Sequence, residues 1–504
     1  MSIRKSFLVA VLTVLAALPL HSSALPLPLS PRQMAARSPH VVVAVVEDAR
    51  SQWNAGHTLI LTEYELRIED RLKGDAPERV TLTVPGGTVG GETHLTSLST
   101  FLETGTRYLL FLEDFDRPSF TPVTGGWQGA FAAQAGGFGD TVRAARELIA
   151  EVEAHPKAAD TEGLARAEDP GLPAKAWDPA GAKFLVEYPP TAPVSFNLIR
   201  PGERFYHVDW DQMAYWNAYA GELFRPSPTP SPTWAFGNGA FDVAGFPTDE
   251  QMRQQLGFGW GGAISTTLVR VQDGRIVEAD LAFNPAYEWT LDDDAATRPG
   301  GPFSFKRIVL SGLGHAWGYG SERLDVTTGP QIQRDSVMNS LVPPFNLPTL
   351  FAVDAQAARS TFGGPPLRDG LITAYSLKNP AGAPVYLPVR ASVSSVRRGA
   401  SFKMVRPVKI ENAGTEDFAD PTVGVYLVPK RFSLEGAIFL KQIQLRGTVR
   451  SGEFRNLELG RVKLPASMPA GSYYFAFVLD VPEDDYPANN QAWSNPEVKI
   501  TVKR

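Results

Sequence analysis

The stretch SFKRIVLSGLGHAWGYGS, residues 304–321, decides how the rest of the chain is interpreted. Four of its apolar side chains recur at a roughly helical period: Phe305, Ile308, Val309 and Leu313. Ser304 is a suitable N-cap, and Gly318 and Gly320 are positioned to stop a helix. The pattern predicts a helix that carries His315 near its C-terminal end. Taken alone, the stretch favours an ordinary buried helix with a hydrogen-bonded core histidine over a metal site.

The segment DSVMNS at residues 335–340 and the order of the flanking elements change that balance. Together with the helix, this segment resembles the Met-turn and active-site helix of metzincins, specifically of secreted bacterial matrixin-like metallopeptidases. The motif of that family is H-E-x-x-H-x-x-G-x-x-H, in which the histidines hold zinc and the glutamate is the general base. The resemblance implies that His315 takes the position of the middle ligand, that Gly318 is the turn glycine and that Met338 floors the metal pocket.

Most of the zinc chemistry is missing from this motif. Ser311 stands in the position of the first histidine, Gly312 in that of the glutamate and Ser321 in that of the third histidine. A catalytic zinc takes three protein ligands and a water, and a general base contributes roughly 10²–10⁴-fold in rate. The resemblance therefore implies no catalytic residue and one surviving ligand position, His315. An active enzyme would need a carboxylate such as Glu322 to help complete the zinc shell.

The alignment also predicts how the site could be restored. Replacing Ser311 and Ser321 by histidine and Gly312 by glutamate should recreate zinc binding if the fold is that of the family. The change at Gly312 should also make the helix firmer, because a glycine within a helix costs about 1 kcal/mol relative to alanine.

Composition excludes several classes of function. The chain has 504 residues, of which 43% are hydrophobic, and this length suggests about three domains. The net charge of −6 gives no basic field for nucleic acid or an anionic membrane surface. The sequence has no cysteine, which excludes disulfides, thiolate zinc ligands and a thiol nucleophile.

Residues 1–24 have the pattern of a secretory signal peptide. Arg4 and Lys5 form the charged start, residues 7–20 are apolar, and residues 22–24 are a small-residue cleavage site. The apolar run is short for a membrane-spanning helix, and no later run is long enough to span a bilayer. We therefore expect a secreted protein, extracellular, periplasmic or on the cell surface, with no membrane span after cleavage. The alternative is an uncleaved membrane anchor.

The chain is predicted to be multidomain, with an N-terminal all-β module, a central α/β (α+β) metzincin-like domain and a C-terminal Ig-like β-sandwich. The boundaries of these parts are 38–135 for the β-barrel or sandwich module, 140–183 for a helix and linker, 184–364 for the matrixin-like domain, 365–385 for a second linker and 386–504 for the sandwich.

The N-terminal module is predicted from short apolar runs at residues 41–47, 58–68, 80–84 and 108–113. It is similar to a β module that precedes matrixin-like domains in secreted bacterial proteins. The glycines at residues 86–91 favour a hairpin turn over a phosphate loop, because no Lys-Ser/Thr pair follows them. Residues 140–155 have helical spacing.

The central domain resembles matrixin-like domains in the order of its elements. These are a helix at 208–223, strands at 263–271 and 276–284, the His315 helix, the Met338 turn and a helix at 348–362. In the family, the strand that matches residues 263–271 borders the cleft and pairs with the substrate backbone. Such an edge strand can also bind an extended peptide by β-augmentation without any metal.

The C-terminal part is predicted to have seven strands, at residues 391–396, 401–411, 422–428, 437–445, 457–463, 473–480 and 498–502. Residues 410–414, residues 470–480 and the pair Asn489-Asn490 are similar to CARDB, a bacterial adhesion-related Ig-like module. The resemblance implies a module for display or contact, with no chemistry of its own.

The expected cofactor is none, with zinc only if the chain is an active peptidase. Asp292, Asp293 and Asp294 are the candidates for a calcium site of the kind that the family carries, because oxygen ligands suit calcium. A solvated acidic loop is favoured over that site, since the spacing is not that of an EF-hand.

Three functions remain open. The favoured hypothesis is a secreted pseudopeptidase that acts by binding a protein or peptide ligand. The second is an active zinc metalloendopeptidase with an atypical site, completed by Glu322, Asp325 or another carboxylate. The third is a structural or adhesive surface protein in which the central domain is a spacer.

Overall fold

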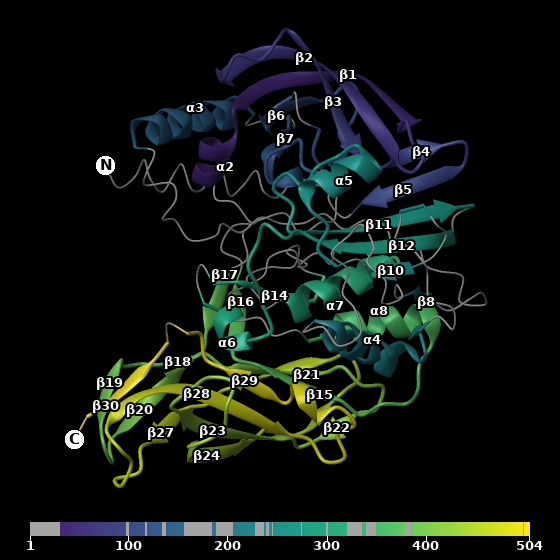
Figure 1. Cartoon of the computed structure of the whole chain (residues 1–504). Helices are drawn as coiled ribbons and strands as arrows, with labels where there is room; N and C mark the ends of the chain where they lie inside the picture. Colours follow the sequence, from purple (N-terminus) through teal and green to yellow (C-terminus); the bar gives the residue numbers. More distant parts are fainter. Residues whose placement is uncertain are drawn as a thin grey trace.

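The computed structural model describes residues 31–96, 100–115, 118–133, 138–155, 184–187, 205–226, 236–237, 241–243, 245–273, 275–298, 301–319, 335–338, 349–378, 385–496 and 498–503. The fold of these residues is mostly β, with few helices (Figure 1). The predicted signal peptide at residues 1–24 and the predicted linker after residue 155 lie outside the described part of the chain. None of the described helices is long and apolar enough to cross a membrane.

The first sheet is antiparallel, with the strand order β3-β2-β1-β6-β7. Its strands are β1 (His40–Trp53), β2 (Ile60–Lys73), β3 (Arg79–Pro85), β6 (Arg107–Leu112) and β7 (Ala130–Ala132). Val42 and Ala44 of β1 pack in one hydrophobic cluster, and Val41 and Val43 pack in another. The second cluster lies under α2 (Pro31–Arg37) and α3 (Phe138–Ala154). Because β1 is covered on both faces, its first half reads as an uninterrupted apolar run.

The strands and the helix predicted in this part are confirmed, with bounds that are longer except for β6, which is shifted by one residue. β1 continues to Trp53, well past its apolar run, because its exposed second half is held by backbone pairing with β2. Hairpin geometry is also confirmed at the glycine-rich turn. Gly90 and Gly91 have φ values of 60° and 87°, which is the conformation that a two-residue turn needs at both central positions.

A second sheet has seven strands, in the order β4-β5-β11-β12-β10-β8-β9. Its strands are β4 (Gly87–Val89), β5 (Glu92–Thr96), β8 (Phe184–Glu187), β9 (Phe224–Pro226), β10 (Phe241–Val243), β11 (Ser265–Gln272) and β12 (Arg275–Phe283). β11 and β12 are antiparallel, whereas β12, β10, β8 and β9 run parallel to one another. The β4–β5 hairpin therefore leaves the N-terminal part and extends the central sheet (Figure 1).

Three helices pack beside this sheet, and their order matches the prediction. They are α4 (Tyr206–Ala220), α7 (Phe305–Ala316) and α8 (Ala352–Phe362). Apolar side chains from all three share one hydrophobic cluster with β11 and β12. α8 begins later than predicted because the Asp354 carboxylate accepts a hydrogen bond from the Phe351 N–H, at 2.9 Å, and so caps the helix there. The shorter elements are α5 (Asp249–Leu256), α6 (Asp293–Ala296), β13 (Trp289–Thr290), β14 (Phe303–Ser304) and the 3-10 turn Gly126–Gly129.

The C-terminal part consists of several small sheets that enclose one hydrophobic cluster. The largest has the order β19-β30-β28-β23-β24, with β29 paired to β28, and two three-stranded sheets have the orders β15-β21-β26 and β18-β20-β27. The bounds are β15 (Gly370–Thr373), β16 (Tyr375–Lys378), β17 (Val385–Pro388), β18 (Arg390–Ala391), β19 (Ser395–Arg397), β20 (Ser401–Val405), β21 (Val408–Asn412), β22 (Phe418–Ala419), β23 (Thr422–Val428), β24 (Ile438–Gln444), β25 (Thr448–Val449), β26 (Phe454–Leu457), β27 (Arg461–Lys463), β28 (Gly471–Asp480), the 3-10 turn Pro487–Asn489, β29 (Gln491–Trp493) and β30 (Ile500–Lys503).

Two expectations for this part are corrected. The predicted linker at 365–385 contains β15, which pairs with β21, and Ile372, which lies in the sandwich core. Three of the seven predicted strands are each split in two. The strand predicted at 401–411, for example, breaks at Arg406, whose φ of 75° is incompatible with extended pairing.

Buried polar contacts fasten the C-terminal sandwich to the central helices. Glu411 Oε2 accepts a hydrogen bond from the Ala352 N–H at the start of α8, at 3.2 Å, and its other oxygen pairs with Lys409. Arg359 of α8 donates to the Ala413 carbonyl at 2.7 Å. Lys409 and Glu411 are both fully buried, so separating the two parts would leave Glu411 Oε2 without its partner on α8.

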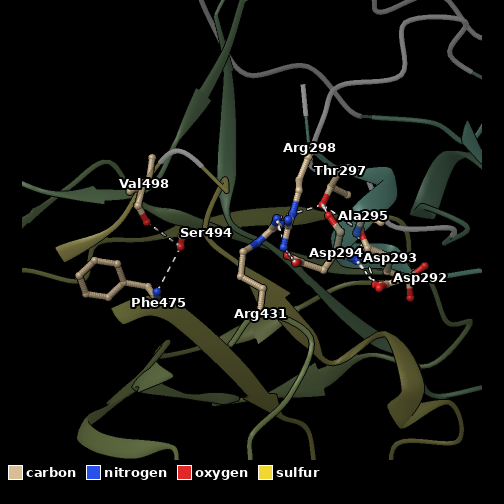
Figure 2. Close-up of polar contacts among 10 residues, drawn as sticks. All are labelled: Asp292, Asp293, Asp294, Ala295, Thr297, Arg298, Arg431, Phe475, Ser494 and Val498. Carbon is tan, nitrogen blue, oxygen red and sulfur yellow. Dashed lines mark hydrogen bonds and ion pairs between the residues drawn. The ribbon is translucent and has the colours of Figure 1, made fainter. Parts of the chain in front are cut away.

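Arg431 makes a second joint between the same two parts (Figure 2). Its Nη1 donates to Asp294 Oδ1 at 3.2 Å and to Thr297 Oγ1 at 3.0 Å. Arg431 is 1% exposed, and burial lowers its pKa to about 10, so the guanidinium keeps its charge at neutral pH. Figure 2 also shows Ser494, whose hydroxyl accepts a hydrogen bond from the Phe475 N–H of β28 and donates one to the Val498 carbonyl.

Replacing Arg431 by methionine should lower the free energy of unfolding by about 3 kcal/mol, because breaking a buried ion pair costs roughly 3–5 kcal/mol. Arg298 still pairs with Asp294 in that variant, which places the loss at the low end of the range. Denaturant unfolding measures the change. The control is Arg143→Met, which breaks an exposed pair with Asp140 and should cost less than about 1 kcal/mol. Equal losses in the two variants would contradict the joint.

Candidate functional site

The predicted active-site helix, α7, is buried on nearly every side. Ser304 caps it as expected, since its hydroxyl accepts the Arg307 N–H at 3.3 Å. All residues of α7 except Lys306 are buried. The Trp216 indole donates to the Leu310 carbonyl at 2.9 Å, which ties α7 to α4. Among the described residues, the helix therefore lies at the centre of the central core.

His315 lies one turn after Ser311 on α7, and both are buried. Burial lowers the pKa of His315 to about 4, although a hydrogen bond with the Tyr319 backbone opposes this shift. The imidazole is neutral at physiological pH. Gly318, the predicted turn glycine, has a φ of 92° and ends the helix as expected.

The predicted Met-turn is held firmly in place. The Asp354 carboxylate accepts hydrogen bonds from the Ser336 hydroxyl and from the Val337 N–H, the latter at 2.9 Å. Arg307 of α7 donates to the Val337 carbonyl at 3.0 Å. The Met338 sulfur packs against Gly314 so closely that a Cβ at Gly314 would overlap it. Met338 therefore contacts Gly314, the residue that precedes His315 in α7.

The position of the general base, Gly312, faces the sheet. A Cβ built on Gly312 would lie 2.6 Å from Leu281 Cδ1 and 3.0 Å from Leu281 Cδ2. Leu281 belongs to β12 and is fully buried. The expectation that Gly312→Glu makes the helix firmer is therefore wrong, because the gain in helix propensity is smaller than the cost of overpacking the core.

The described residues around His315 do not fit a zinc site. No group of three or more His, Cys, Asp or Glu side chains comes together in the described part of the chain. Ser321, the third ligand position, and the rescue carboxylates Glu322 and Asp325 lie outside the described residues. A single imidazole beside a serine hydroxyl lacks the three ligands that catalytic zinc takes.

The outer edge of β11 is already paired with the chain's own β5. The register runs antiparallel from Leu268 opposite Thr96 to Gln272 opposite Glu92. This is the edge that the resemblance assigned to substrate backbone. Along residues 268–272, a peptide could bind only by displacing the hairpin.

Side chains reinforce that pairing. His94 of β5 is buried, and its Nδ1 accepts the Ile60 N–H at 3.1 Å. Its Nε2 lies 3.0 Å from Glu92 Oε1, so the ring donates a hydrogen bond from this nitrogen. Glu92 also pairs with Arg270 of β11 at 2.6 Å. The hairpin is thus anchored to both the first and the second sheet.

The three consecutive carboxylates of the calcium prediction have structural partners. Asp292 caps α6 by accepting the Asp294 N–H at 2.9 Å. Asp293 pairs with Lys306 at 2.9 Å, and Asp294 pairs with Arg298 and Arg431. They form neither a solvated loop nor a convergent set of oxygens, because each serves a different neighbour. The calcium prediction remains a prediction.

Sequence reasoning missed a cavity of about 320 Å³ between the central helices and the C-terminal sandwich. Its lining combines α4, α7, the start of α8 and the segments near residues 372–375 and 486–493. No local pattern signals such a site, since its walls come from segments spread between Asp211 and Trp493.

Replacing Gly312 by alanine should destabilise the protein by roughly 1–3 kcal/mol, the usual cost of overpacking a core. The loss should shrink when Leu281 is also replaced by alanine, since the clash is then removed. Thermal and denaturant unfolding of both single variants and the double variant measure this coupling. Gly139→Ala in α3, where a Cβ would meet nothing within 4 Å, is the control and should cause no loss. Additive effects at Gly312 and Leu281 would contradict the contact.

His315 should make stability depend on pH. Its folded-state pKa of about 4 is below the usual value of about 6.5, so the unfolded state binds the proton more tightly. The stability linked to this group is complete above about pH 6.5 and is lost as pH falls from there toward about 4. His315→Gln should therefore narrow the stability difference between pH 7 and pH 4 by roughly 3 kcal/mol. Urea unfolding across this range gives the answer, and parallel curves for the two proteins would count against a buried, neutral His315.

Comparison with known proteins gives little guidance. No protein-family model and no curated protein matches the chain. Among solved structures, the CARDB domain of a Pyrococcus furiosus protein is 14% identical, with a TM-score of 0.17, over 27% of this chain and 90% of that chain. The sporulation control protein Spo0M of Bacillus subtilis is 13% identical, with a TM-score of 0.16, over 27% of this chain and 50% of that chain. The C-terminal domain of wzt is 15% identical, with a TM-score of 0.15, over 27% of this chain and 72% of that chain. Similarities at these TM-scores assign neither fold nor function.

Proposed function

We propose that this chain is an exported protein with a matrixin-like peptidase frame that no longer hydrolyses peptides and acts by binding a protein or peptide. The observation that carries the proposal is the packing of Gly312 against Leu281. A side chain at this position would require Leu281 to move, so the core leaves little room for a glutamate there.

The order of elements supports the matrixin-like part of the proposal. α4, β11, β12, α7, the Met338 turn and α8 follow one another as that family implies. We propose units at residues 38–135 and 184–364, with a CARDB-like sandwich that begins at β15 and not at residue 386. A signal peptide at residues 1–24 would direct the protein out of the cytoplasm.

The β5–β11 pairing supports binding over hydrolysis, because a substrate would need that edge. It also moves the proposed partner surface away from residues 263–271. A structural or adhesive role is the second candidate, and the buried joints at Glu411 and Arg431 favour it. These joints make the sandwich a rigid extension of the central part, which suits a surface protein that transmits contact.

Metal content tests the proposal. The purified mature protein, equilibrated with zinc and freed of excess metal, should hold less than about a tenth of an equivalent, since one imidazole is too few ligands. Elemental analysis measures this, and hydrolysis of a denatured protein substrate should stay at the buffer rate. Zinc near one equivalent would overturn the proposal and favour the alternative of an active peptidase that uses Glu322 or Asp325.

A restoring variant tests the family assignment separately. Ser311→His with Ser321→His supplies the two missing ligands without touching Gly312, and it should bind about one equivalent of zinc if the frame is matrixin-like. Ser311→Ala with Ser321→Ala is the matched control. A folded double-histidine variant that takes up no zinc would count against the matrixin-like frame.

A further inference from the structure

The β4–β5 hairpin is fastened to the first sheet through one buried imidazole. The Ile60 N–H of β2 donates to His94 Nδ1 at 3.1 Å, so this nitrogen carries no proton. The other nitrogen, Nε2, therefore carries the proton and donates to Glu92 Oε1 at 3.0 Å. His94 is 5% exposed, and the centre of its ring lies 5.1 Å from that of Trp53. The closed hairpin thus requires a neutral imidazole.

Protonation of His94 would remove this fastening. An imidazolium has a proton on both nitrogens and accepts no hydrogen bond, so an Nδ1–H would face the Ile60 N–H. Ile60 is fully buried, and a buried N–H that loses its acceptor is unfavourable. Moving the hairpin away relieves this contact and lets water reach both groups.

The charges nearest to His94 would not hold a protonated hairpin in place. Glu92 lies on the same strand, β5, so its ion pair with His94 can leave together with the hairpin. Arg270 of β11 pairs with Glu92 at 2.6 Å and stays behind, and its charge repels a protonated His94. Arg270 Nη1 also lies 3.6 Å from Glu278 Oε2 of β12, which remains as its partner. Asp280 of β12 is the further charged group beside this cluster.

The titration of these groups has the sign that such a release needs. Burial lowers the pKa of His94, Glu92 opposes this shift, and Arg270 adds to it. Burial raises the pKa of Glu92, but hydrogen bonds from Arg270 and His94 outweigh it and lower that pKa, so Glu92 keeps its charge in mild acid. The open hairpin binds the proton more tightly than the closed one. The stability of the closed form is therefore complete above about pH 6.5 and is lost as pH falls below that value.

We propose that the β4–β5 hairpin is an acid-released cover of the β11 edge. At neutral pH, β5 occupies residues 268–272 of this edge. Among the described strands, β4 pairs with β5 alone, so the hairpin can leave as one unit. Gly86 and Gly87 at its base have φ values of 102° and 138°, in the range where glycine moves freely. An uncovered edge strand can pair with an extended peptide. The proposal concerns the hairpin alone and holds whether or not the central part is matrixin-like.

Hydrogen–deuterium exchange of the full mature chain at about pH 7.5 and about pH 4.5 tests the proposal. The quantity to compare is the protection factor of residues 92–96 divided by that of β12, which corrects for intrinsic exchange and for a global loss of stability through His315. This ratio should fall at least about tenfold at the lower pH, because the acid form leaves a buried N–H without its acceptor. His94→Gln removes the titrating ring and should make the ratio independent of pH, whatever its value at neutral pH.

His57→Asn is the matched control. His57 is exposed in the turn between β1 and β2, and asparagine tolerates its φ of 51°. This variant should show the same fall in the ratio as the wild type. A ratio that does not change with pH in the wild type would overturn the proposal, and so would an equal fall in the wild type and His94→Gln.

Discussion

The burial of α7 on nearly every side is the constraint on which the rest of the structure depends. Two glycines let neighbouring elements approach the helix closely, with Leu281 of β12 against Gly312 and Met338 against Gly314. Larger residues at either position would push the sheet or the turn away. The packing that stabilises the central core therefore leaves little room for a side chain at either position.

Strand pairing and buried polar contacts join the three regions of the chain. The N-terminal hairpin is a strand of the central sheet, because β5 pairs with β11. The C-terminal sandwich places Glu411 and Arg431 where they hydrogen-bond to groups of the central part. Buried charges of this kind are costly to expose singly, so neither flanking region can swing away without loss.

Sequence patterns were informative where structure is local and uninformative where it is not. The N-cap at Ser304 and the period of the apolar residues predicted α7 closely. The glycines at residues 90 and 91 likewise predicted the turn of the β4–β5 hairpin. The sequence did not indicate which strand pairs with that hairpin, because β5 and β11 are far apart in sequence. Segment 365–385 was mistaken for a linker since β15 is only four residues long. The sequence also did not indicate that Gly312 faces the sheet, because a glycine has no side chain whose polarity predicts its neighbours.

The central claim is that β5 pairs with the edge of β11 along residues 268–272 and so occupies the edge to which another chain could pair. Hydrogen–deuterium exchange of residues 92–96 and 265–272 in the intact protein tests it most directly, since backbone amides in a stable ladder exchange only on opening. The account predicts that both segments exchange slowly, at rates similar to those of β12. Fast exchange in residues 92–96 beside a protected β12 would contradict it, because the edge of β11 would then be free to bind another chain.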